Sequence, residues 1–349
     1  MRSNLLVIGN YGYVNNQIDG QTIKTRNIYK LLKSKEEYIG YVNYYDTQQF
    51  KVSWKYVLKM FIIMIKYDKI IIIPGFNFME YIFPAVFIIS KIYKISLDII
   101  VVGGWLYKYL QVRKLHTFIV KQVGSIFPQS NILTAKLNCH LNQNNVLTLH
   151  NFRMHNHLPL HSIKKYDNEL RIVFMARITR EKGIDLIIGL AERIYNTIPF
   201  KNIYIDFYGP LFYKDEEEYL FDEMRKYKNL KYKGLIEPHN VYKTLSKYDV
   251  LLLPTRYPGE GFPGSILDAY IAGIPVIVSR WMNLPEFVNH EETGFIFDLD
   301  NEQSLYSFVL RLYNDRNLLD RMKNNAMKES KKYSSEFAWQ VLEKRILNN

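Results

Sequence analysis

A glycine-rich segment between two apolar stretches carries the residues best suited to chemistry. It runs from Pro254 to Val278 and has the pattern of a buried strand, a loop, a helix and a second buried strand. The loop holds Glu260 and opens onto the helix, which contains Asp268 about one turn in. A helix start has unpaired N–H groups and the positive end of the helix dipole, so it attracts phosphate. The segment therefore predicts a cradle for a diphosphate beside two carboxylates, which fits a nucleotide-sugar.

The two acids have separate expected roles. Glu260 can accept hydrogen bonds from sugar hydroxyls, and Asp268 can accept from a ribose diol, as the ribose acid of dinucleotide folds does. The backbone between them is expected to hold phosphate: Gly261, Phe262, Pro263, Gly264, Ser265 and Ile266. A glycoside hydrolase, which needs two carboxyls about 5–9.5 Å apart across one bond, fits less well, since both acids belong to one loop–helix unit. The alternative is a plain strand–helix turn with a solvated Glu260.

A second element supplies cations. Arg177 falls at the end of an apolar strand, and Lys182 lies just before a helix that starts near Gly183. Both can reach the carboxyl edge of a parallel sheet, where two cations would neutralise a diphosphate and stabilise it as it departs. The alternative is surface charge on a turn, which is the interpretation we favour for Arg180 and Glu181.

These two elements resemble the family 4 (group 1) glycosyltransferases of GT-B fold. The resemblance covers roughly residues 170–333 and includes the trailing stretch from Leu284 to Phe295. It implies that Arg177 and Lys182 bind the diphosphate, that Glu260 contacts the donor sugar, and that these three residues carry catalysis. Ala176 replaces the family's usual glycine, and Asp268 replaces its second glutamate, which shortens the expected reach to the ribose.

The resemblance is weaker elsewhere in the chain. Gly20 and Gln21 resemble the family's glycine loop, which approaches the donor phosphates, although a simple helix N-cap explains them as well. Many relatives have a histidine after the fourth strand, whereas this chain has Gly103 and Gly104, which allow either a backbone approach to the sugar or a tight turn. Further candidate donor contacts follow two predicted strands. They are Gly209 and Ile236, the latter within the loop Gly234–Glu237 that we expect to select the base.

Apolar strand patterns alternate with helical ones along the 349 residues, which predicts parallel sheets with helices on both faces. The fold class expected is α/β, of GT-B type, with two Rossmann-like doubly wound domains facing a central cleft. The expected boundaries are 1–155 for an acceptor-binding domain, 165–334 for a nucleotide-sugar-binding domain, and 335–349 for a last helix that crosses back. The first half is expected to contain strands at Leu5–Gly9, Tyr38–Tyr44, Lys69–Pro74, Leu97–Gly103, Gly124–Pro128 and Asn145–Leu149. The second half is expected to contain strands at Arg171–Ala176, Ile203–Tyr208, Leu230–Gly234, Val250–Pro254, Val276–Ser279 and Gly294–Phe297.

Charge is concentrated in the first half of the chain. Residues 1–163 hold 19 Lys and Arg against 7 Asp and Glu, whereas residues 164–349 hold 27 of each. A basic surface attracts anionic lipid, a phosphate-bearing acceptor or nucleic acid. No nucleic-acid-binding motif accompanies the charge, so we favour a membrane surface or a lipid-phosphate acceptor. The helix expected at Trp54–Lys66 fits a membrane-surface helix and ordinary amphipathic packing equally well.

We expect no metal and no cofactor. The two halves are expected to meet at a polar linker near Asn151–Asn168. Four histidines in or beside it (His150, His155, His157 and His161) lack a common zinc spacing. Asp298 and Asp300 form an Asp-x-Asp string, but Asp300 would more simply cap the next helix. One cysteine, no signal peptide and no apolar run near the ~18 residues of a membrane span favour a cytoplasmic location, with contact at the inner membrane face.

The resemblance implies transfer, with retention, from a UDP- or GDP-sugar to a hydroxyl of a glycan. The acceptor expected is a glycan or a polyprenyl-diphosphate-linked oligosaccharide, as in capsule, O-antigen or exopolysaccharide synthesis. Three alternatives remain open. They are a non-catalytic nucleotide-sugar-binding protein of the same fold, a phosphorylase-like enzyme, and a nucleic-acid-binding protein.

Overall fold

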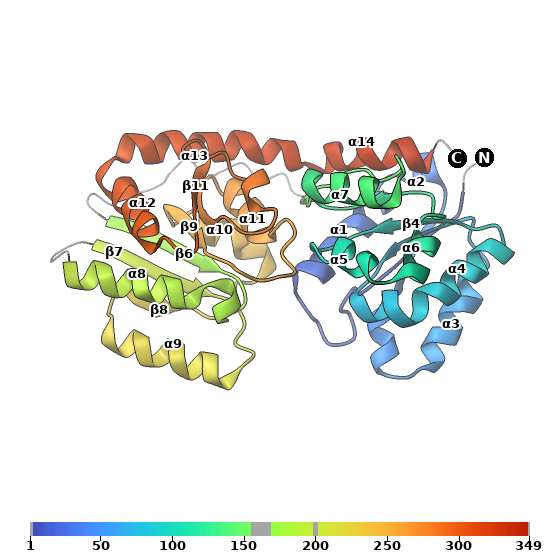
Figure 1. The fold of residues 1–349 in the computed structure, drawn as a ribbon, viewed down its shortest axis with the longest axis horizontal. Helices are drawn as coiled ribbons and strands as arrows, with labels where there is room; N and C mark the ends of the chain where they lie inside the picture. Colours follow the sequence, from blue (N-terminus) through green and yellow to red (C-terminus); the bar gives the residue numbers. More distant parts are fainter. Residues whose placement is uncertain (1–2, 155–168, 198–201, 348–349) are drawn as a thin grey trace. The chain divides into compact units, whose positions relative to one another are not determined.

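The structure is a computed structural model, and it describes residues 3–154, 169–197 and 202–347. Contacts divide the chain into two compact units. One comprises Met1–His155 with Tyr333–Asn349, and the other comprises Asn156–Lys332. Each unit is a parallel sheet covered by helices, and Figure 1 labels the elements. The predicted α/β class with two parallel-sheet domains is confirmed.

The first unit is built on a five-stranded parallel sheet in the order β2-β1-β3-β4-β5. The strands are β1 (Leu5–Gly9), β2 (Val42–Asp46), β3 (Lys69–Ile73), β4 (Ser96–Ile100) and β5 (Ile126–Phe127). Their residues are mostly buried, as is typical of a parallel sheet packed on both faces. Because all strands run in one direction, the loops that follow them meet at one edge of the sheet.

Helices cover both faces of this sheet. They are α1 (Gly20–Lys33), α2 (Glu36–Ile39), α3 (Lys55–Met64), α4 (Phe83–Ile92), α5 (Leu106–Gln111), α6 (Lys114–Val120), α7 (Asn131–Leu141) and α14 (Ser335–Ile346). One apolar cluster joins Ile8 and Ile72 to residues of α3 to α7, and another joins Val7 to residues of α1 and α14. The C-terminal helix therefore packs on the first unit, through Trp339 and Leu342.

Two strand predictions for the first half were wrong in part, and two helices were missed. The strand expected at Tyr38–Tyr44 lies at Val42–Asp46, since Glu36–Ile39 is a short helix that ends at Gly40 (φ 116°). Asn145–Leu149 is not a strand, although Val146 bridges Ile126 beside β5. Helices α5 and α6 were not predicted.

The second unit contains a six-stranded parallel sheet in the order β11-β10-β9-β6-β7-β8. The strands are β6 (Glu169–Met175), β7 (Asn202–Tyr208), β8 (Leu230–Tyr232), β9 (Val250–Leu253), β10 (Val276–Ser279) and β11 (Gly294–Phe297). The helices are α8 (Ile184–Thr197), α9 (Lys214–Lys226), α10 (Val241–Leu245), α11 (Gly264–Ile271), α12 (Glu302–Asn314) and α13 (Arg316–Ser330). All six strands predicted for this half are present, with small shifts at their ends.

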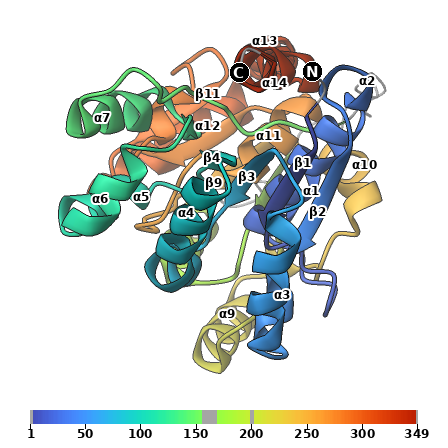
Figure 2. The same cartoon turned by 90° about the vertical axis from the view of Figure 1, so that its right-hand side faces the viewer.

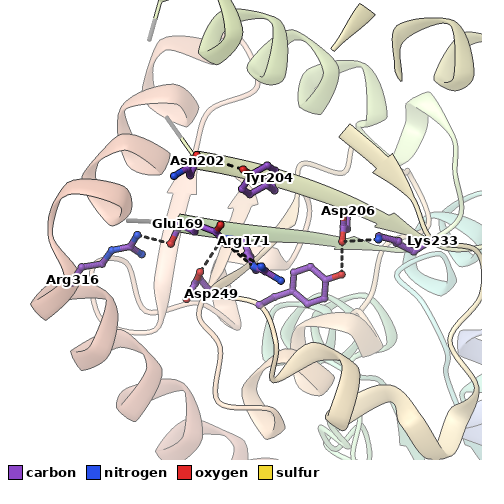
Figure 3. Close-up of polar contacts among 9 residues, drawn as sticks. Glu169, Arg171, Asn202, Tyr204, Asp206, Lys233, Asp249 and Arg316 are labelled. Carbon is purple, nitrogen blue, oxygen red and sulfur yellow. Dashed lines mark hydrogen bonds and ion pairs between the residues drawn. The ribbon is translucent and has the colours of Figure 1, made fainter. Parts of the chain in front are cut away.

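A polar network ties the second sheet to its helices (Figure 3). The N–H of Arg171 donates to Asp249 at 2.9 Å, and the other carboxylate oxygen of Asp249 pairs with Lys323 of α13 at 2.7 Å. The Tyr248 hydroxyl, just before β9, donates to Asp206 of β7 at 2.7 Å. Burial raises the pKa of Tyr248 well above its ordinary value, so its hydroxyl remains a donor. This network contains none of the predicted site residues, and its role is to hold α13 and the region before β9 against the sheet.

Candidate functional site

The candidate residues of the second unit lie in loops at the carboxyl edge of its sheet. Arg177 and Lys182 follow β6, and Glu260 follows β9. These two strands are neighbours in the sheet. After β6 the chain adds β7 and β8 on one side, and it then returns to add β9 on the other side of β6, so the strand order reverses between β6 and β9. Ligands of open parallel sheets bind outside the carboxyl ends of the strands at such a switch point.

Lys182 and Glu260 form a buried ion pair. The Lys182 ammonium donates to Glu260 Oε2 at 2.6 Å, and the two side chains are 11% and 8% exposed. The hydroxyl of Thr255 donates to the same oxygen at 2.9 Å. The sequence assigned these residues to a phosphate and to a sugar, and the structure brings their charged groups into direct contact. An ammonium has three N–H donors, so its pairing with Glu260 does not exhaust its capacity for an anion.

Gly183 explains why the two loops meet. Its φ of +86° and its position against β9 both require glycine, because a Cβ there would lie 2.2 Å from the Pro254 carbonyl oxygen. Backbone and side-chain contacts add to this packing. The Arg256 N–H donates to the Glu181 carbonyl at 2.8 Å, and the Arg256 guanidinium pairs with Asp185 at 2.7 Å. The two loops therefore behave as one packed element that carries Lys182 to Glu260.

Tyr257 is a candidate site residue that the sequence analysis missed. Its ring lies under both predicted phosphate-binding cations, 4.8 Å from Arg177 Cζ and 4.5 Å from Lys182 Nζ. Gly259 makes room for the ring, since a Cβ at that position would lie 2.8 Å from it. Trp281 fixes the loop by donating from its indole to the Tyr257 carbonyl at 2.8 Å. A loop tyrosine has no periodic signal, so the sequence offered no means of finding this contact.

The glycine-rich stretch leads into the start of α11. Helix α11 begins at Gly264 after Pro263, and no side chain among the described residues caps it. The side chain of Phe262 is turned into the core, where it stacks on Phe287 with ring centroids 3.9 Å apart. Phe262 thus offers a ligand only its backbone, whereas the half-buried Ser265 adds a hydroxyl to the start of the helix. An uncapped helix start beside a cation pair is suited to an anion.

Asp268 lies in the same helix but is largely buried. It is 9% exposed, and its Oδ1 accepts a hydrogen bond from the Tyr242 hydroxyl of α10 at 3.4 Å. Its role towards a ribose stays a prediction.

Gly209 and Ile236 follow β7 and β8 at the same edge. Gly209 has φ +150°, and a Cβ there would lie 1.7 Å from the Ala176 carbonyl oxygen. Its own N–H donates to the Gly234 carbonyl at 3.0 Å, and its carbonyl accepts from the Tyr232 hydroxyl at 2.9 Å. This packing alone accounts for a glycine at 209. Ile236 is half-buried in the loop that begins at Gly234.

The first-unit candidates lie at the carboxyl edge of the other sheet. Gly20 begins α1, and Asp19 caps this helix by accepting from the Thr22 N–H at 2.9 Å, while the Thr22 hydroxyl accepts from the Asp19 N–H. The alternative of a simple N-cap is therefore realised here, and a carboxylate already occupies the helix start. The amide group of Gln21 lies near Gly75, at the switch point between β1 and β3.

Gly103 follows β4 with φ +86°. Its N–H donates to Gln129 Oε1 at 3.0 Å. This bond and the left-handed backbone fit the tight turn that the sequence left open beside a contact with a sugar.

The described residues contain no group of three or more His, Cys, Asp or Glu side chains that could hold a metal. His155, His157 and His161 lie outside the described residues. Asp298 pairs with Arg280 at 2.7 Å. The prediction that Asp300 caps the next helix was wrong, because Asn301 caps α12. Among the described helices, none has the length and apolarity needed to cross a membrane.

Comparison with known proteins finds a family model that matches most of the second unit, and curated relatives that match part of the chain. Residues 161–329 match the family model described as glycosyl transferases group 1. An uncharacterised glycosyltransferase of Methanocaldococcus jannaschii is 29% identical over 187 residues, which are 54% of this chain and 46% of that protein. The amylovoran biosynthesis glycosyltransferase AmsK of Erwinia amylovora is 26% identical over 41% of this chain and 36% of its own length. The chain thus spans less than half the length of these curated relatives.

The crystal structure of HepE from Anabaena in complex with UDP and glucose resembles the whole chain. The TM-score is 0.72 at 13% identity, with 98% of this chain and 99% of that chain covered. The chain therefore has the GT-B fold, and its second unit contains a segment similar to the group 1 glycosyltransferases.

Proposed function

We propose that this protein is a retaining glycosyltransferase of family 4, which moves a sugar from a nucleotide-diphosphate sugar to a hydroxyl of a glycan. The observation that carries the proposal is the meeting of Lys182 and Glu260 at the switch point of the second sheet. Arg177 and the start of α11 belong to the same edge. A cation pair, a carboxylate and a helix start are the groups that a diphosphate joined to a sugar requires.

The proposed mechanism uses these groups in separate roles. Arg177, Lys182 and the backbone of Gly261–Ile266 hold the diphosphate and stabilise the charge that develops as it leaves. Glu260 accepts hydrogen bonds from sugar hydroxyls and so orients the sugar. The acceptor hydroxyl attacks from the face of the leaving group, and its proton passes to the departing phosphate oxygen. The new glycosidic bond then has the configuration of the bond that breaks.

In this proposal, the donor is a UDP- or GDP-sugar, and the reaction requires no metal or cofactor. The HepE structure contains UDP and glucose, which favours UDP. The remaining candidate contacts are Asp268 towards the ribose, Gly209 and Ile236 towards the nucleotide, and Gly20, Gln21 and Gly103 from the first unit.

The acceptor proposed is a glycan or a polyprenyl-diphosphate-linked oligosaccharide of a capsule, O-antigen or exopolysaccharide. AmsK, by its name, serves amylovoran synthesis, which supports this class. The first unit would bind the acceptor. The proposed location is the cytoplasm, at the inner face of an anionic membrane.

A thermal-shift screen against UDP, GDP, ADP and their sugars tests the donor assignment. A ligand present at 100 times its Kd stabilises the folded state by about 2.7 kcal/mol, which corresponds to a Tm rise of roughly 5–10 °C for a unit of this size. We expect such a rise with one uridine or guanosine diphosphate series, together with release of that diphosphate from its sugar when a glycan acceptor is added. Stabilisation without any turnover across a panel of acceptors would favour a nucleotide-sugar-binding protein. No stabilisation by any diphosphate would refute the proposal.

A further inference from the structure

Three neighbouring helices of the first unit expose apolar side chains to solvent. In both views α4 lies between α3 and α6 (Figures 1 and 2). We call their shared outward surface the α3–α6 face, and it includes the residues that flank these helices. Its large apolar side chains are 41–77% exposed: Trp54, Leu58, Ile62, Ile65, Tyr81, Ile88, Ile92, Leu115 and Phe118.

The spacing of these residues follows the helices. On α3 and its flanks, Trp54, Leu58, Ile62 and Ile65 recur every three or four residues, which places them on one side. The opposite side of α3 contributes Met60 and Met64 to the core. A helix that covers a core needs one apolar side, so a second apolar side indicates a second apolar partner.

The charges around this face are of one sign. Residues 51–122, all of which the structure describes, contain nine exposed lysines and a single exposed acid, Asp68. The lysines are Lys51, Lys55, Lys59, Lys66, Lys91, Lys94, Lys108, Lys114 and Lys121. The remaining charged residues of the segment pair with one another, Lys69 with Asp98 at 3.5 Å and Arg113 with Glu80 at 3.1 Å. The face therefore combines an apolar centre with an uncompensated positive charge.

The outward sides of helices in the second unit differ. Helix α9 has the sequence KDEEEYLFDEMRK, in which basic and acidic groups are mixed, and its side chains form ion pairs such as Lys226 with Glu223 at 2.7 Å. Helices α12 and α13 have no large apolar side chain among the exposed ones. Solvent-exposed helices of this protein therefore need not carry the exposed apolar side chains and unpaired lysines of the α3–α6 face.

We propose that the α3–α6 face binds the surface of an anionic phospholipid bilayer. Apolar side chains on such a surface enter the boundary between headgroups and acyl chains, and each nearby lysine adds an attraction to anionic lipid. The helices lie on the bilayer rather than cross it, since none of the described ones is long enough to span it. This inference extends the proposed function, in which a lipid-linked acceptor is met at a membrane.

Two other occupants fit less well. In a symmetric dimer through this face, the lysines of one copy would meet those of the other, which is repulsive. Nucleic acid would use the lysines but gives no reason for exposed Trp54, Ile62, Ile88 and Ile92. A bilayer surface satisfies both the apolar side chains and the charge.

Vesicle co-sedimentation of the full chain tests the proposal, with phosphatidylcholine vesicles that contain or lack phosphatidylglycerol. We expect binding to the anionic vesicles that weakens as salt is added. The double variants Trp54→Ser/Ile62→Ser and Lys55→Glu/Lys59→Glu should each lower the partition coefficient by about tenfold or more. Two variants of exposed second-unit residues are matched controls, Tyr195→Ser/Phe221→Ser and Lys228→Glu/Lys231→Glu, and they should bind as the parent does.

The outcomes separate this inference from the proposed function. All four variants should keep the Tm and the response to UDP or GDP of the parent, because the altered side chains are exposed and lie outside the candidate site. No binding to anionic vesicles, or equal losses in the face and control variants, would overturn the inference whether or not a nucleotide binds. The inference would also be overturned if light scattering showed a dimer that Trp54→Ser/Ile62→Ser abolishes while no vesicle binding is found. Binding to DNA as strong as binding to anionic vesicles would overturn it as well.

Discussion

The buried ion pair between Lys182 and Glu260 predicts that substitutions of these two residues change the free energy of unfolding and the affinity for a nucleotide diphosphate in different ways. The variants are Lys182→Met, Glu260→Gln and the double variant. In Lys182→Met, Glu260 keeps its charge in a site where it is 8% exposed and retains the Thr255 hydroxyl as a donor. In Glu260→Gln, the Lys182 ammonium keeps only weaker partners, such as the Tyr257 ring. The double variant removes both charges, so no uncompensated charge remains in the site.

The magnitudes follow from this geometry. Removing one member of a buried ion pair costs about 3–5 kcal/mol, and the Thr255 hydrogen bond places Lys182→Met near the lower limit of that range. We expect Glu260→Gln to cost roughly 2 kcal/mol, because a cation–π contact of about 1–2 kcal/mol remains. The double variant should cost about 1 kcal/mol or less, so that the coupling free energy is roughly 4 kcal/mol. The Tm of Lys182→Met should fall by about 6–12 °C.

Affinity for a free nucleotide diphosphate should change in opposite directions. Lys182→Met removes a charged hydrogen bond worth about 1.5–3 kcal/mol and should weaken binding by roughly 10- to 150-fold. Glu260→Gln removes the carboxylate that competes with phosphate for the ammonium, so affinity should stay equal or rise while sugar transfer is lost.

Urea unfolding, calorimetry with UDP or GDP, and a transfer assay measure these quantities. Each variant is compared with the parent under the same conditions. A coupling free energy below about 0.5 kcal/mol would show that the ion pair does not contribute in the way proposed. A parallel loss of nucleotide affinity in both single variants would refute the separate roles.

Three further predictions concern neighbouring features. Tyr257→Ala should lower the free energy of unfolding by about 1–3 kcal/mol and weaken nucleotide diphosphate binding, whereas Tyr257→Phe should keep both properties; calorimetry that finds the two variants alike would contradict the ring contact. Gly209→Ala should destabilise the protein by more than Gly234→Ala, which we expect to cost about 1–2 kcal/mol. Both residues have positive φ, but only at position 209 would the added Cβ collide with another residue; urea unfolding compares the two variants. Burial and Arg153 lower the pKa of Lys24 well below 10.5, so the unfolded chain binds more protons than the folded one between the lowered value and 10.5. The free energy of unfolding should therefore rise with pH over that window, and urea titrations should find this rise absent in Lys24→Met.

The second unit could be predicted from the sequence in considerable detail. Its strands are short apolar runs, and three of the five intervals between them contain a helix of eight or more residues, such as α11. Periodicity and turn residues therefore mark most boundaries. In the first unit, α5 and α6 span only six and seven residues, too few for a helical period to be evident. The short helix Glu36–Ile39 had a readable signal, since two acids begin it and Gly40 ends it. The aromatic and β-branched residues that follow it, such as Tyr41, Val42 and Tyr44, favour a strand instead.

The candidate site was predictable in its residue types but not in its contacts. Lys182 and Glu260 are 78 positions apart in the sequence, and their pairing depends on the adjacency of β6 and β9 and on Gly183 packing against Pro254. Neither the strand order nor a loop contact has a local sequence signal. The same holds for Tyr257, whose position depends on the path of a loop that contains two glycines and three prolines.

The charged residues of the first unit are distributed differently at the carboxyl edge of its sheet and on the helices that cover the sheet. At the carboxyl edge of its sheet, the charges near β1 and β2 are of both signs. Asp19 caps α1, Asp46 accepts from the Tyr11 and Tyr13 N–H groups, and Arg26 donates to the Tyr11 carbonyl at 2.7 Å. The start of α1 is capped by a carboxylate, so it is less open to a phosphate than the uncapped start of α11. Nine exposed lysines belong instead to the helices that cover one face of the sheet and their flanks, where exposed apolar residues accompany them. We therefore propose that the cations of the second unit neutralise the donor diphosphate, and that the exposed lysines beside the apolar face of the first unit contact a lipid surface.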